Sequence, residues 1–484
     1  MASPAIVWFR RDLRLADNPA LAAAVASGRP VLPLFVLEDD ADRAWAPGGA
    51  ARWWLSRNLA ALRDDLGKAG TELVIRRGKA EQVVPALARE TGAGEVHWNR
   101  RYEPAAIASD TAIKAALREA GLEVHSHNAS LLFEPWTIAT KAGRPFRVFT
   151  PFWRACLASE MPKGPGARPE AIRGSSVGAC TLNVGDLGLE PHKPDWAGGL
   201  ADTWKPGEAG ADAALKQFLG KSLQRYDNKR NIPSVEGTSA LSPYLQVGAL
   251  GPRQVWHAAM ALGARPDLAD GPGVFLKELI WREFSYHLLF HMPHLPEANF
   301  DPAFDAMPWR DDAEGLRRWQ RGLTGYPMVD AGMRQLWATG WMHNRVRMVV
   351  ASFLTKHLLI DWRHGAHWFW DTLVDADLAS NSASWQWVAG CGADAAPFFR
   401  IFNPITQGEK FDPAGDYVRR WVPELAGIPD KLLQKPWTGE AAVMERAGVR
   451  LGRNYPEPIV DHAAARKRAL ETWQTHIRKS SPEE

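Results

Sequence analysis

The chain has 484 residues, of which 46% are hydrophobic and 23% charged, and its formal net charge is +3. This length predicts two or three domains of about 150 residues, and no apolar run reaches the roughly 20 residues of a membrane-spanning helix. The first residues lack the basic start of a secretory signal, and the three widely spaced cysteines favour neither a disulfide framework nor a zinc site. We therefore expect a cytoplasmic protein without membrane association, in which any nucleic-acid binding depends on a local basic patch.

Residues 1–130 alternate short apolar runs with amphipathic stretches. The expected strands are 6–9, 31–37, 73–75, 96–98 and 124–127, and the expected helices are 51–69, 81–91 and 104–120. Alternating β and α units predict a parallel sheet covered by helices. No Gly-x-Gly-x-x-Gly and no P-loop sequence follows these strands, so we expect a Rossmann-like α/β domain without the usual dinucleotide signature.

A long connection and a helical region follow. Residues 161–210 contain 10 Gly and 6 Pro, which is typical of a segment that crosses the surface. Beyond about residue 213, apolar residues recur at three- and four-residue spacing, for example at 277–292, 328–340 and 344–359, and this spacing predicts helices. The expected division is an α/β domain at 1–130, an interdomain linker at 131–212 and an all-α domain at 213–484.

Residues 236–245 read Glu-Gly-Thr-Ser-Ala-Leu-Ser-Pro-Tyr-Leu. Hydroxyls, a glycine turn and free amides just ahead of a helix that starts near Pro243 could bind a phosphate. A plain serine N-cap followed by proline is the simpler interpretation of the same residues.

Two predicted helices each place chemically useful side chains on one face. Glu278, Trp281 and Arg282 share a face that could stack a base and hydrogen-bond its edge, although a solvated Glu–Arg ion pair has the same spacing. In the second helix the side chains that share a face are those of Asn344, Arg347 and Met348, while Arg345 points elsewhere. A basic solvent face is the alternative there.

Asp375 and Asp377 open a segment, 375–387, that is expected to be a loop or turn, because carboxylates two residues apart do not share a helix face. No third ligand lies at a suitable spacing, so no metal is expected. A carboxylate here could accept hydrogen bonds from a ribose or a ring N–H, or pair with Arg347.

Tryptophan is unusually frequent, with 23 Trp against 7 Tyr, and nine of the 23 lie between residues 309 and 387. Each one alone fits core packing. As a cluster they could form an electron-hopping chain or a stacking platform for bases, and their spacing does not decide between these roles.

Eight segments, in order along nearly the whole chain, resemble the photolyase/cryptochrome family. They are residues 8–21, 149–152, 236–245, 278–284, 324–327, 340–348, 375–387 and 399–404. The resemblance implies a carbon–carbon lyase that repairs cyclobutane pyrimidine dimers in DNA with light, by electron transfer from excited reduced FAD to a flipped-out dimer. It also implies that the helical domain binds the FAD.

The resemblance further implies the site residues. Those that would hold FAD are Tyr226, Thr238, Ser239, Ala240, Leu241, Ser242, Phe275, Glu278, Arg282, Asn344, Arg347, Asp375, Ala376, Asp377 and Asn381. The catalytic group would comprise Glu278 toward the dimer, Asn381 facing flavin N5, and a photoreduction relay of Trp385, Trp362 and Trp309. DNA would be bound by Arg230, Trp281, Arg345, Met348, Trp387, Arg400 and Gln407, with the two tryptophans stacked on the dimer.

Single residues favour dimer repair of the class I or class III type within this family. Asn344 and Met348 stand where the similar (6-4) photolyases have histidine, and Asn381 stands where plant cryptochromes have an acid and insect cryptochromes a cysteine. The alternatives are a cryptochrome-type blue-light photoreceptor that binds FAD without repair, and a flavoprotein electron-transfer module. The expected partner is DNA containing cyclobutane dimers, with no obligate protein partner and a monomeric protein.

A second, antenna chromophore is also implied. The enterobacterial type holds folate with Asn-Glu and Cys-Lys pairs, at positions that look like Ala105-Ala106 and Pro296-Glu297 here. Methenyltetrahydrofolate held by other residues is the favoured expectation, and the alternatives are deazaflavin or no antenna at all. Phe275 replaces the Trp of several relatives beside FAD.

Overall fold

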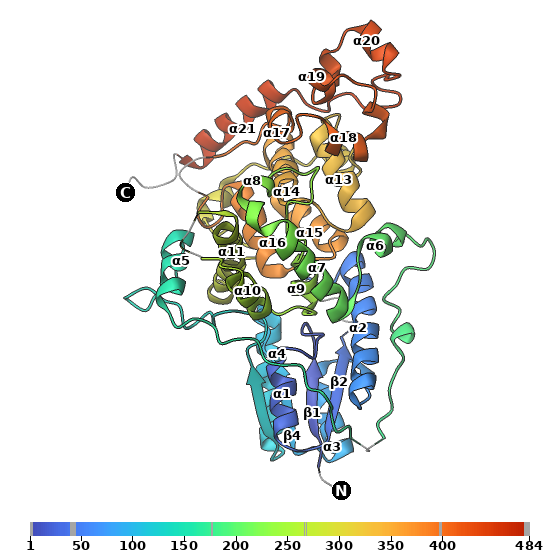
Figure 1. The fold of residues 1–484 in the computed structure, drawn as a ribbon. Coiled ribbons are helices and arrows are strands. Elements are labelled where there is room, and N and C mark those ends of the chain that lie inside the picture. The colour runs from blue at the N-terminus through green and yellow to red at the C-terminus, as the bar shows by residue number, and fades with distance from the viewer. Residues whose placement is uncertain are drawn as a thin grey trace.

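A computed structural model of the chain describes residues 3–38, 45–175, 178–265, 267, 269–395 and 399–478. An α/β unit built on one sheet lies at one end of the molecule, and a larger body of helices lies at the other (Figure 1). The strands are β1 Ala5–Phe9, β2 Val31–Leu37, β3 Val74–Arg77, β4 Glu95–Asn99 and β5 Glu123–His127. They pair in parallel in the order β3-β2-β1-β4-β5, so the predicted α/β domain and helical domain are confirmed.

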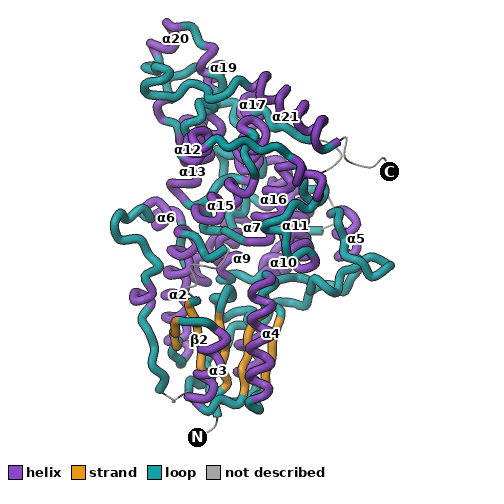
Figure 2. Tube along the Cα trace, turned by 180° about the vertical axis from the view of Figure 1, so that it is seen from behind, coloured by secondary structure: helices purple, strands orange, loops and turns teal. Residues whose placement is uncertain are grey.

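Helices cover both faces of the sheet, as the continuously apolar central strands β1 and β2 require. Helices α1 Pro19–Ala26 and α2 Gly49–Ala69 lie on one face, and α3 Ala80–Thr91 and α4 Pro104–Glu119 lie on the other (Figures 1 and 2). Side chains alternate along each strand, so Ile6 and Trp8 pack with α3 and α4. Val7 and Phe9 join the core that continues into the helical body.

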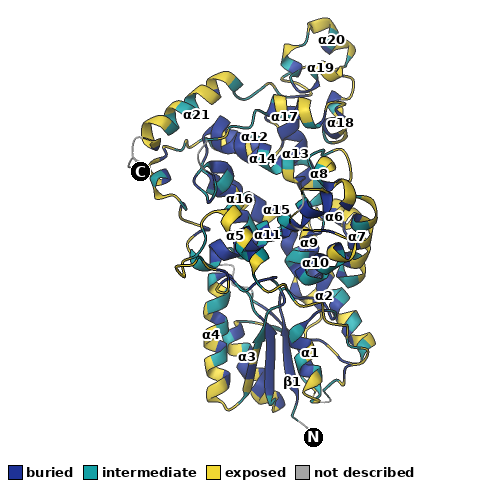
Figure 3. Ribbon diagram, turned by 60° about the vertical axis from the view of Figure 1, so that its left-hand side comes forward, coloured by how far each residue is buried: buried dark blue, intermediate teal, exposed yellow. Residues whose placement is uncertain are grey.

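The rest of the described chain is helical. The α-helices are α5 Phe149–Ala158, α6 Gly198–Thr203, α7 Gly207–Lys221, α8 Tyr226–Lys229, α9 Ser242–Val247, α10 Pro252–Ala261, α11 Gly271–His291, α12 Ala313–Gln320, α13 Pro327–Thr339, α14 Asn344–Ser352, α15 Trp362–Thr372, α16 Leu378–Ala389, α17 Pro404–Phe411, α18 Asp416–Trp421, α19 Asp430–Leu433, α20 Ala441–Arg446 and α21 His462–His476. Short helical turns lie at Val184–Leu187, Leu223–Arg225, Pro302–Ala306, Phe353–Leu358, Pro423–Leu425 and Pro436–Thr438. Exposed residues gather on α21 and on the outer side of α4 (Figure 3). None of the described helices has the length and apolar character to span a membrane.

Three segments differ from the sequence expectations. Helix α1 was not predicted, because its Pro-Ala-Leu-Ala-Ala-Ala-Val-Ala sequence has no polar face to give a period. The helix expected at 344–359 is α14 followed by a π-helical turn, Phe353–Leu358, which Leu359 ends at φ +60°. The expectation of a loop at 375–387 is wrong beyond Asp377, because that carboxylate caps a regular helix, α16.

The segment after β1 joins the sheet to the helical body. Glu208 of α7 accepts hydrogen bonds from the backbone N–H groups of Leu15 and Ala16, at 2.7 and 3.0 Å. The Arg14 guanidinium donates to the Gly248 carbonyl at 3.0 Å. Gly248 has φ +76°, and a Cβ there would lie 2.1 Å from the carbonyl oxygen of Arg11. This contact therefore holds the end of α9 against the carboxyl end of β1.

Candidate functional site

The loop before α9 has a tightly constrained backbone. Ala240 adopts φ +50°, a left-handed conformation that non-glycine residues seldom occupy. A Cβ on Gly237 would lie 2.4 Å from the carbonyl oxygen of Lys229. Helix α9 begins at Ser242 with Leu241 in the N-cap position, and no side chain caps it. The helix start near Pro243 is thus confirmed, and the serine-cap interpretation is wrong.

The Ser242 hydroxyl instead donates to Asp375, which connects three elements. Asp375 Oδ2 accepts from Ser242 Oγ at 2.6 Å and from Arg347 Nη2 at 2.8 Å, so the expected pair with Arg347 forms. The side chain of Asp375 is only 3% exposed, and its Oδ1 is buried with no hydrogen-bond partner among the described residues. A buried carboxylate oxygen without a donor is costly. The free Oδ1 is therefore suited to a ligand hydroxyl or ring N–H.

Asp377, two residues further along the chain, has different hydrogen-bond partners. It accepts from the backbone N–H of Ser380 at 2.8 Å, which caps α16, and from the Tyr286 hydroxyl. Burial, reinforced by the Asp377 charge, raises the pKa of Tyr286 well above its usual range, so the phenol stays a donor. Tyr286 was not singled out in the sequence, although it lies one helical turn after Arg282.

Arg282 faces the sheet unit. Its guanidinium donates to the Ser130 carbonyl at 2.7 Å and lies 4.9 Å from the centre of the Tyr286 ring. Glu278, one turn earlier, pairs with Arg230 of the segment after α8 at 2.5 Å. The alternative of a solvated Glu278–Arg282 pair is therefore wrong. The shared helix face instead connects α11 to two separate parts of the chain.

The two tryptophans expected to stack on a base are both half-buried, on α11 and α16. The Trp281 ring lies parallel to Phe149, with 3.6 Å between the ring centres. Trp387 lies 6.4 Å from Phe402, and the Arg400 guanidinium lies 5.3 Å from its ring centre. The Phe149 contact was missed, although residues 149–152 stood out as a motif, because nothing in the spacing indicates that Phe149 and Trp281 meet.

The other charged and polar residues assigned to DNA lie on α14 and α17. Arg345 donates to Asn231 Oδ1 at 2.8 Å, and its guanidinium lies 4.5 Å from the Phe411 ring centre. It therefore points away from the Arg347–Asp375 pair, as its helical position predicts. Gln407 carries a buried Oε1 that has no hydrogen-bond partner in the described ranges of the chain. Asn344 is exposed and Met348 is half-buried on the same helix.

The remaining residues assigned to the cofactor line the same region. Phe275, on α11, lies 5.4 Å from Tyr226 between ring centres, and burial raises the pKa of the Tyr226 hydroxyl. Ala376 is buried, and its carbonyl accepts from Gln246 Nε2 at 3.1 Å. Side-chain exposure still differs among the members of the loop: Leu241 is buried, Thr238, Ser239 and Ala240 are half-buried, and Ser242 is exposed.

The three tryptophans of the expected relay differ in burial, and the ring neighbours of Trp385 are residues outside the relay. Trp385 and Trp362 are buried, and Trp309 is half-buried. Among the described rings, the neighbours of Trp385 are Phe369 at 5.0 Å and Trp319 at 6.2 Å. Asn381 lies one turn before Trp385, is buried, and donates to the Ala366 carbonyl at 3.0 Å.

In the helical body joined to the parallel α/β unit, Arg347 and Ser242 meet at the buried carboxylate of Asp375, which is suited to a polar ligand. Comparison with known proteins makes the class specific. A model of the DNA photolyase family matches residues 5–170, and a model of the FAD binding domain of DNA photolyase matches residues 275–475. The chain belongs to the DNA photolyase family.

Individual relatives match nearly the full length of this chain. The chain is 53% identical to a deoxyribodipyrimidine photo-lyase of Agrobacterium fabrum, over 97% of this chain and 98% of that one. It is 40% identical to cryptochrome-1 of Arabidopsis thaliana, covering 97% of this chain and 70% of that protein. A crystal structure of a bacterial class III photolyase from Agrobacterium tumefaciens superposes with a TM-score of 0.95 at 52% identity, covering 99% and 98% of the two chains.

Proposed function

We propose that this protein repairs cyclobutane pyrimidine dimers in DNA by a light-driven reaction. The observation that carries the proposal is the 53% identity, over nearly the whole of both chains, to a deoxyribodipyrimidine photo-lyase. The expected product is the pair of restored pyrimidines, because the reaction breaks the two carbon–carbon bonds of the cyclobutane ring.

FAD fits the groups around α9, α11, α14 and α16. Asp375 offers an unpartnered buried oxygen to a hydroxyl or ring N–H, and Arg347 balances its charge at 2.8 Å. The loop at 236–242 supplies hydroxyls and backbone amides of the kind that bind phosphates, with Ser242 already oriented by Asp375. Arg282 adds a further cation on the adjoining face of α11.

When bound and reduced, FAD supplies the light-driven electron; the chain supplies the position of the substrate. Trp281 and Trp387 offer aromatic faces to an extruded dimer, at roughly 1–3 kcal/mol per stacked base. This offsets an extrusion cost of a few kcal/mol, which is lowest for a damaged and poorly stacked pair. Glu278 would hydrogen-bond the dimer, and the Arg230 pair orients that carboxylate. Arg345 and Arg400 would bind the adjoining phosphates.

We assign photoreduction to Trp385, Trp362 and Trp309, with Trp385 nearest the cofactor. Trp385→Phe should slow reduction of oxidised FAD under blue light by at least tenfold. It should leave repair by chemically reduced protein nearly unchanged, because repair itself does not use the relay. Flash photolysis and single-turnover repair measure the two steps separately. Loss of both would show that Trp385 is needed for more than photoreduction.

A second chromophore that harvests light forms part of the proposal. Methenyltetrahydrofolate is our favoured candidate and deazaflavin the alternative, since Ala105-Ala106 and Pro296-Glu297 cannot hold folate in the enterobacterial way. Extraction of the purified protein followed by mass spectrometry distinguishes the two. We also propose a monomer in the cytoplasm.

The experiment that tests the main proposal uses an oligonucleotide with one cyclobutane thymine dimer. Protein with reduced FAD should restore the thymines under blue light, with no repair in the dark and none of a (6-4) lesion. Absence of dimer repair by protein shown to hold reduced FAD would contradict the proposal and favour the photoreceptor that binds FAD without repair.

A further inference from the structure

A basic arm, defined as residues 139–148, leads into α5 and carries Lys141, Arg144 and Arg147. All three side chains are exposed. The stretch from 135 to 159 contains no Asp or Glu, and no ion pair to these three cations occurs within the residues that the structure describes. Cations left without acidic neighbours are the groups that an external anion can neutralise most easily.

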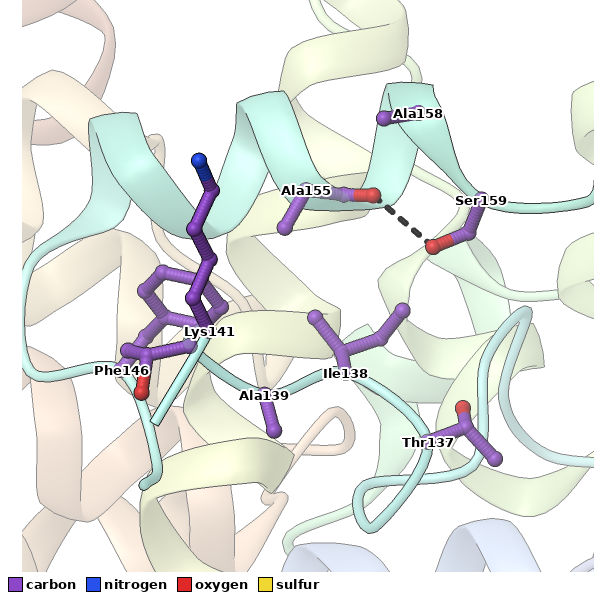
Figure 4. A pocket seen from close by; sticks show the side chains of 9 residues that line it. Thr137, Ile138, Ala139, Lys141, Phe146, Ala155, Ala158 and Ser159 are labelled. Atoms are coloured by element: carbon purple, nitrogen blue, oxygen red, sulfur yellow. Dashed lines mark hydrogen bonds between the residues drawn. The ribbon is translucent and has the colours of Figure 1, made fainter. Parts of the chain in front are cut away.

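The tip of the basic arm is a closed turn. The Thr140 N–H donates to the Arg144 carbonyl at 2.9 Å, and the Gly143 N–H donates to the Thr140 carbonyl at 2.8 Å. Gly143 has φ +72°, which the turn requires. A cavity of about 470 Å³ separates this tip from α5. Figure 4 shows the Lys141 side chain extending past the helix, with no hydrogen bond from its ammonium group to the other residues drawn.

The base of the arm adjoins residues that lie next to the two tryptophans of the proposed lesion site. The Arg147 guanidinium lies 4.6 Å from the centre of the Phe300 ring. The N–H of Phe300 donates at 2.7 Å to Gln386, the residue before Trp387. Two residues after Arg147, the Phe149 ring lies 3.6 Å from Trp281. Arg147 is therefore connected to Trp387 through one contact chain and to Trp281 through another.

Two of the cations previously assigned to DNA are already engaged within the protein. Arg230 is paired with Glu278, which compensates its charge, and Arg345 binds the neutral amide of Asn231. The arm adds three exposed cations that have no ion pair among the described residues. Such charges release condensed counterions when they meet phosphates, which is the main source of salt-dependent affinity for DNA.

We propose that the basic arm is a second phosphate-binding element, which contacts the DNA backbone beside the lesion site. This inference rests on the proposed repair of DNA dimers. Because phosphate contacts carry no sequence or lesion information, the arm strengthens binding to damaged and undamaged duplex equally. Discrimination in favour of the dimer depends on Trp281, Trp387 and Glu278.

The test measures binding of the full-length protein, with FAD, to matched duplexes with and without one dimer over a range of salt concentrations. The variant is Lys141→Gln/Arg144→Gln/Arg147→Gln. The slope of log affinity against log salt should decrease in magnitude by about two to three, near 0.9 for each lost phosphate contact. Affinity for both duplexes should fall roughly 10- to 100-fold near 0.1 M salt, while their ratio, the FAD content and photoreduction stay unchanged.

The matched control removes three cations elsewhere: Lys68→Gln/Arg89→Gln/Arg118→Gln. These residues occupy the last turns of α2, α3 and α4, at the far end of the α/β unit (Figures 1 and 2). The control should keep the wild-type slope. The Arg147→Lys variant, which retains the charge, should also keep most of the wild-type slope.

Three results separate the inference from the proposed function. An unchanged slope in the arm variant, with or without a loss of affinity, overturns the role of the arm. An equal decrease in the control variant also overturns it, because the effect would then follow net charge. Failure of the wild-type protein to repair the dimer while the arm variant still loses slope would contradict the proposed function and leave the phosphate contact supported.

Discussion

At the scale of single residues, Asp375 determines how the candidate cofactor site is organised. One oxygen already binds Ser242 and Arg347, and the other is buried and free. One oxygen of this carboxylate therefore orients two protein groups, while the other can accept a hydrogen bond from a ligand. Asp377, its near neighbour in sequence, has both oxygens occupied by Ser380 and Tyr286. The two carboxylates therefore have different tasks, which their spacing alone does not reveal.

Asp375→Asn should weaken FAD binding by at least tenfold. The amide cannot serve Ser242, Arg347 and a ligand donor together, and hydrogen bonds to a charged group are worth about 1.5–3 kcal/mol each. Titration of the apoprotein with FAD, followed by flavin fluorescence, measures the effect. Asp371→Asn is the control, because within the described part of the chain the Asp371 carboxylate accepts only from the exposed backbone N–H of Gly49. Equal affinities for the two variants would show that Oδ1 has no ligand.

At the scale of elements, the π-helical turn after α14 places a lysine inside the protein. Lys356 is 1% exposed, its ammonium donates to the Val388 carbonyl near the end of α16, and it lies 4.6 Å from the Phe399 ring centre. Burial lowers the pKa of Lys356 to about 7, with Cys391 opposing the shift. Burial also lowers the pKa of the neighbouring His357 to about 3 and raises the pKa of the Cys391 thiol. The turn therefore connects the core to the helix that carries Asn381, Trp385 and Trp387.

This lysine makes the stability depend on pH. The unfolded amine keeps its proton to about pH 10.4, whereas the folded amine loses it near pH 7. Between these values the unfolded state binds more protons, so the free energy of unfolding rises with pH, by up to about 1.4 kcal/mol per pH unit. Lys356→Met should be more stable than wild type at pH 6, and this advantage should shrink by pH 9.

Urea unfolding at pH 6, 7, 8 and 9 measures this change. Lys410→Met is the matched control, because Lys410 also lies near an aromatic ring, Phe411, but is exposed. Its difference from wild type should not vary with pH. A pH-independent difference for Lys356→Met would contradict the assignment of this titration to the buried amine.

The periodicity of the elements explains which of them the sequence predicted. Helices α2, α3, α4, α11 and α13 have an apolar stripe or clear end signals, and each lies within a few residues of its predicted range except the start of α11. The start of α11 was not predicted because its first residues are Gly271, Pro272 and Gly273, which are poor helix formers. The Asp270 side chain caps this start by accepting from the backbone N–H of Gly273 at 2.8 Å. Helix α16 was missed because most of its residues are buried, so no polar face marks the period.

At the scale of the whole molecule, the junction between the sheet unit and the helical body positions α9. Gly248 ends α9 at φ +76° and lies against the backbone of Arg11 and Asp12. Gly248→Ala should lower the free energy of unfolding by about 2–4 kcal/mol, from left-handed strain and overpacking, and should reduce FAD retention. Thermal unfolding and the flavin content after gel filtration measure both effects.

Gly67→Ala is the control for this glycine. Gly67 lies in α2, is exposed, and has open space around a built Cβ. Alanine there should raise the stability by about 0.5–1 kcal/mol without changing flavin content. If Gly248→Ala unfolded like wild type and kept its FAD, the two units would not depend on this close approach.

The sequence by itself determined the class of fold, the order of the strands along the chain, several of the helices, and the family, because apolar periodicity and motif residues are local properties. It also offered a pair with Arg347 as one of the alternatives for the carboxylates of Asp375 and Asp377. Only the tertiary structure decided that Ser242 binds Asp375 instead of capping α9, that Glu278 pairs with Arg230, and that Phe149 stacks on Trp281. These contacts join residues 48 to 133 positions apart, and no local pattern encodes which distant side chains meet when the helices pack. The physical reason is that a charged or aromatic side chain is partnered by the groups that are buried beside it when the helices pack, and the spacing of residues along the chain does not specify those groups.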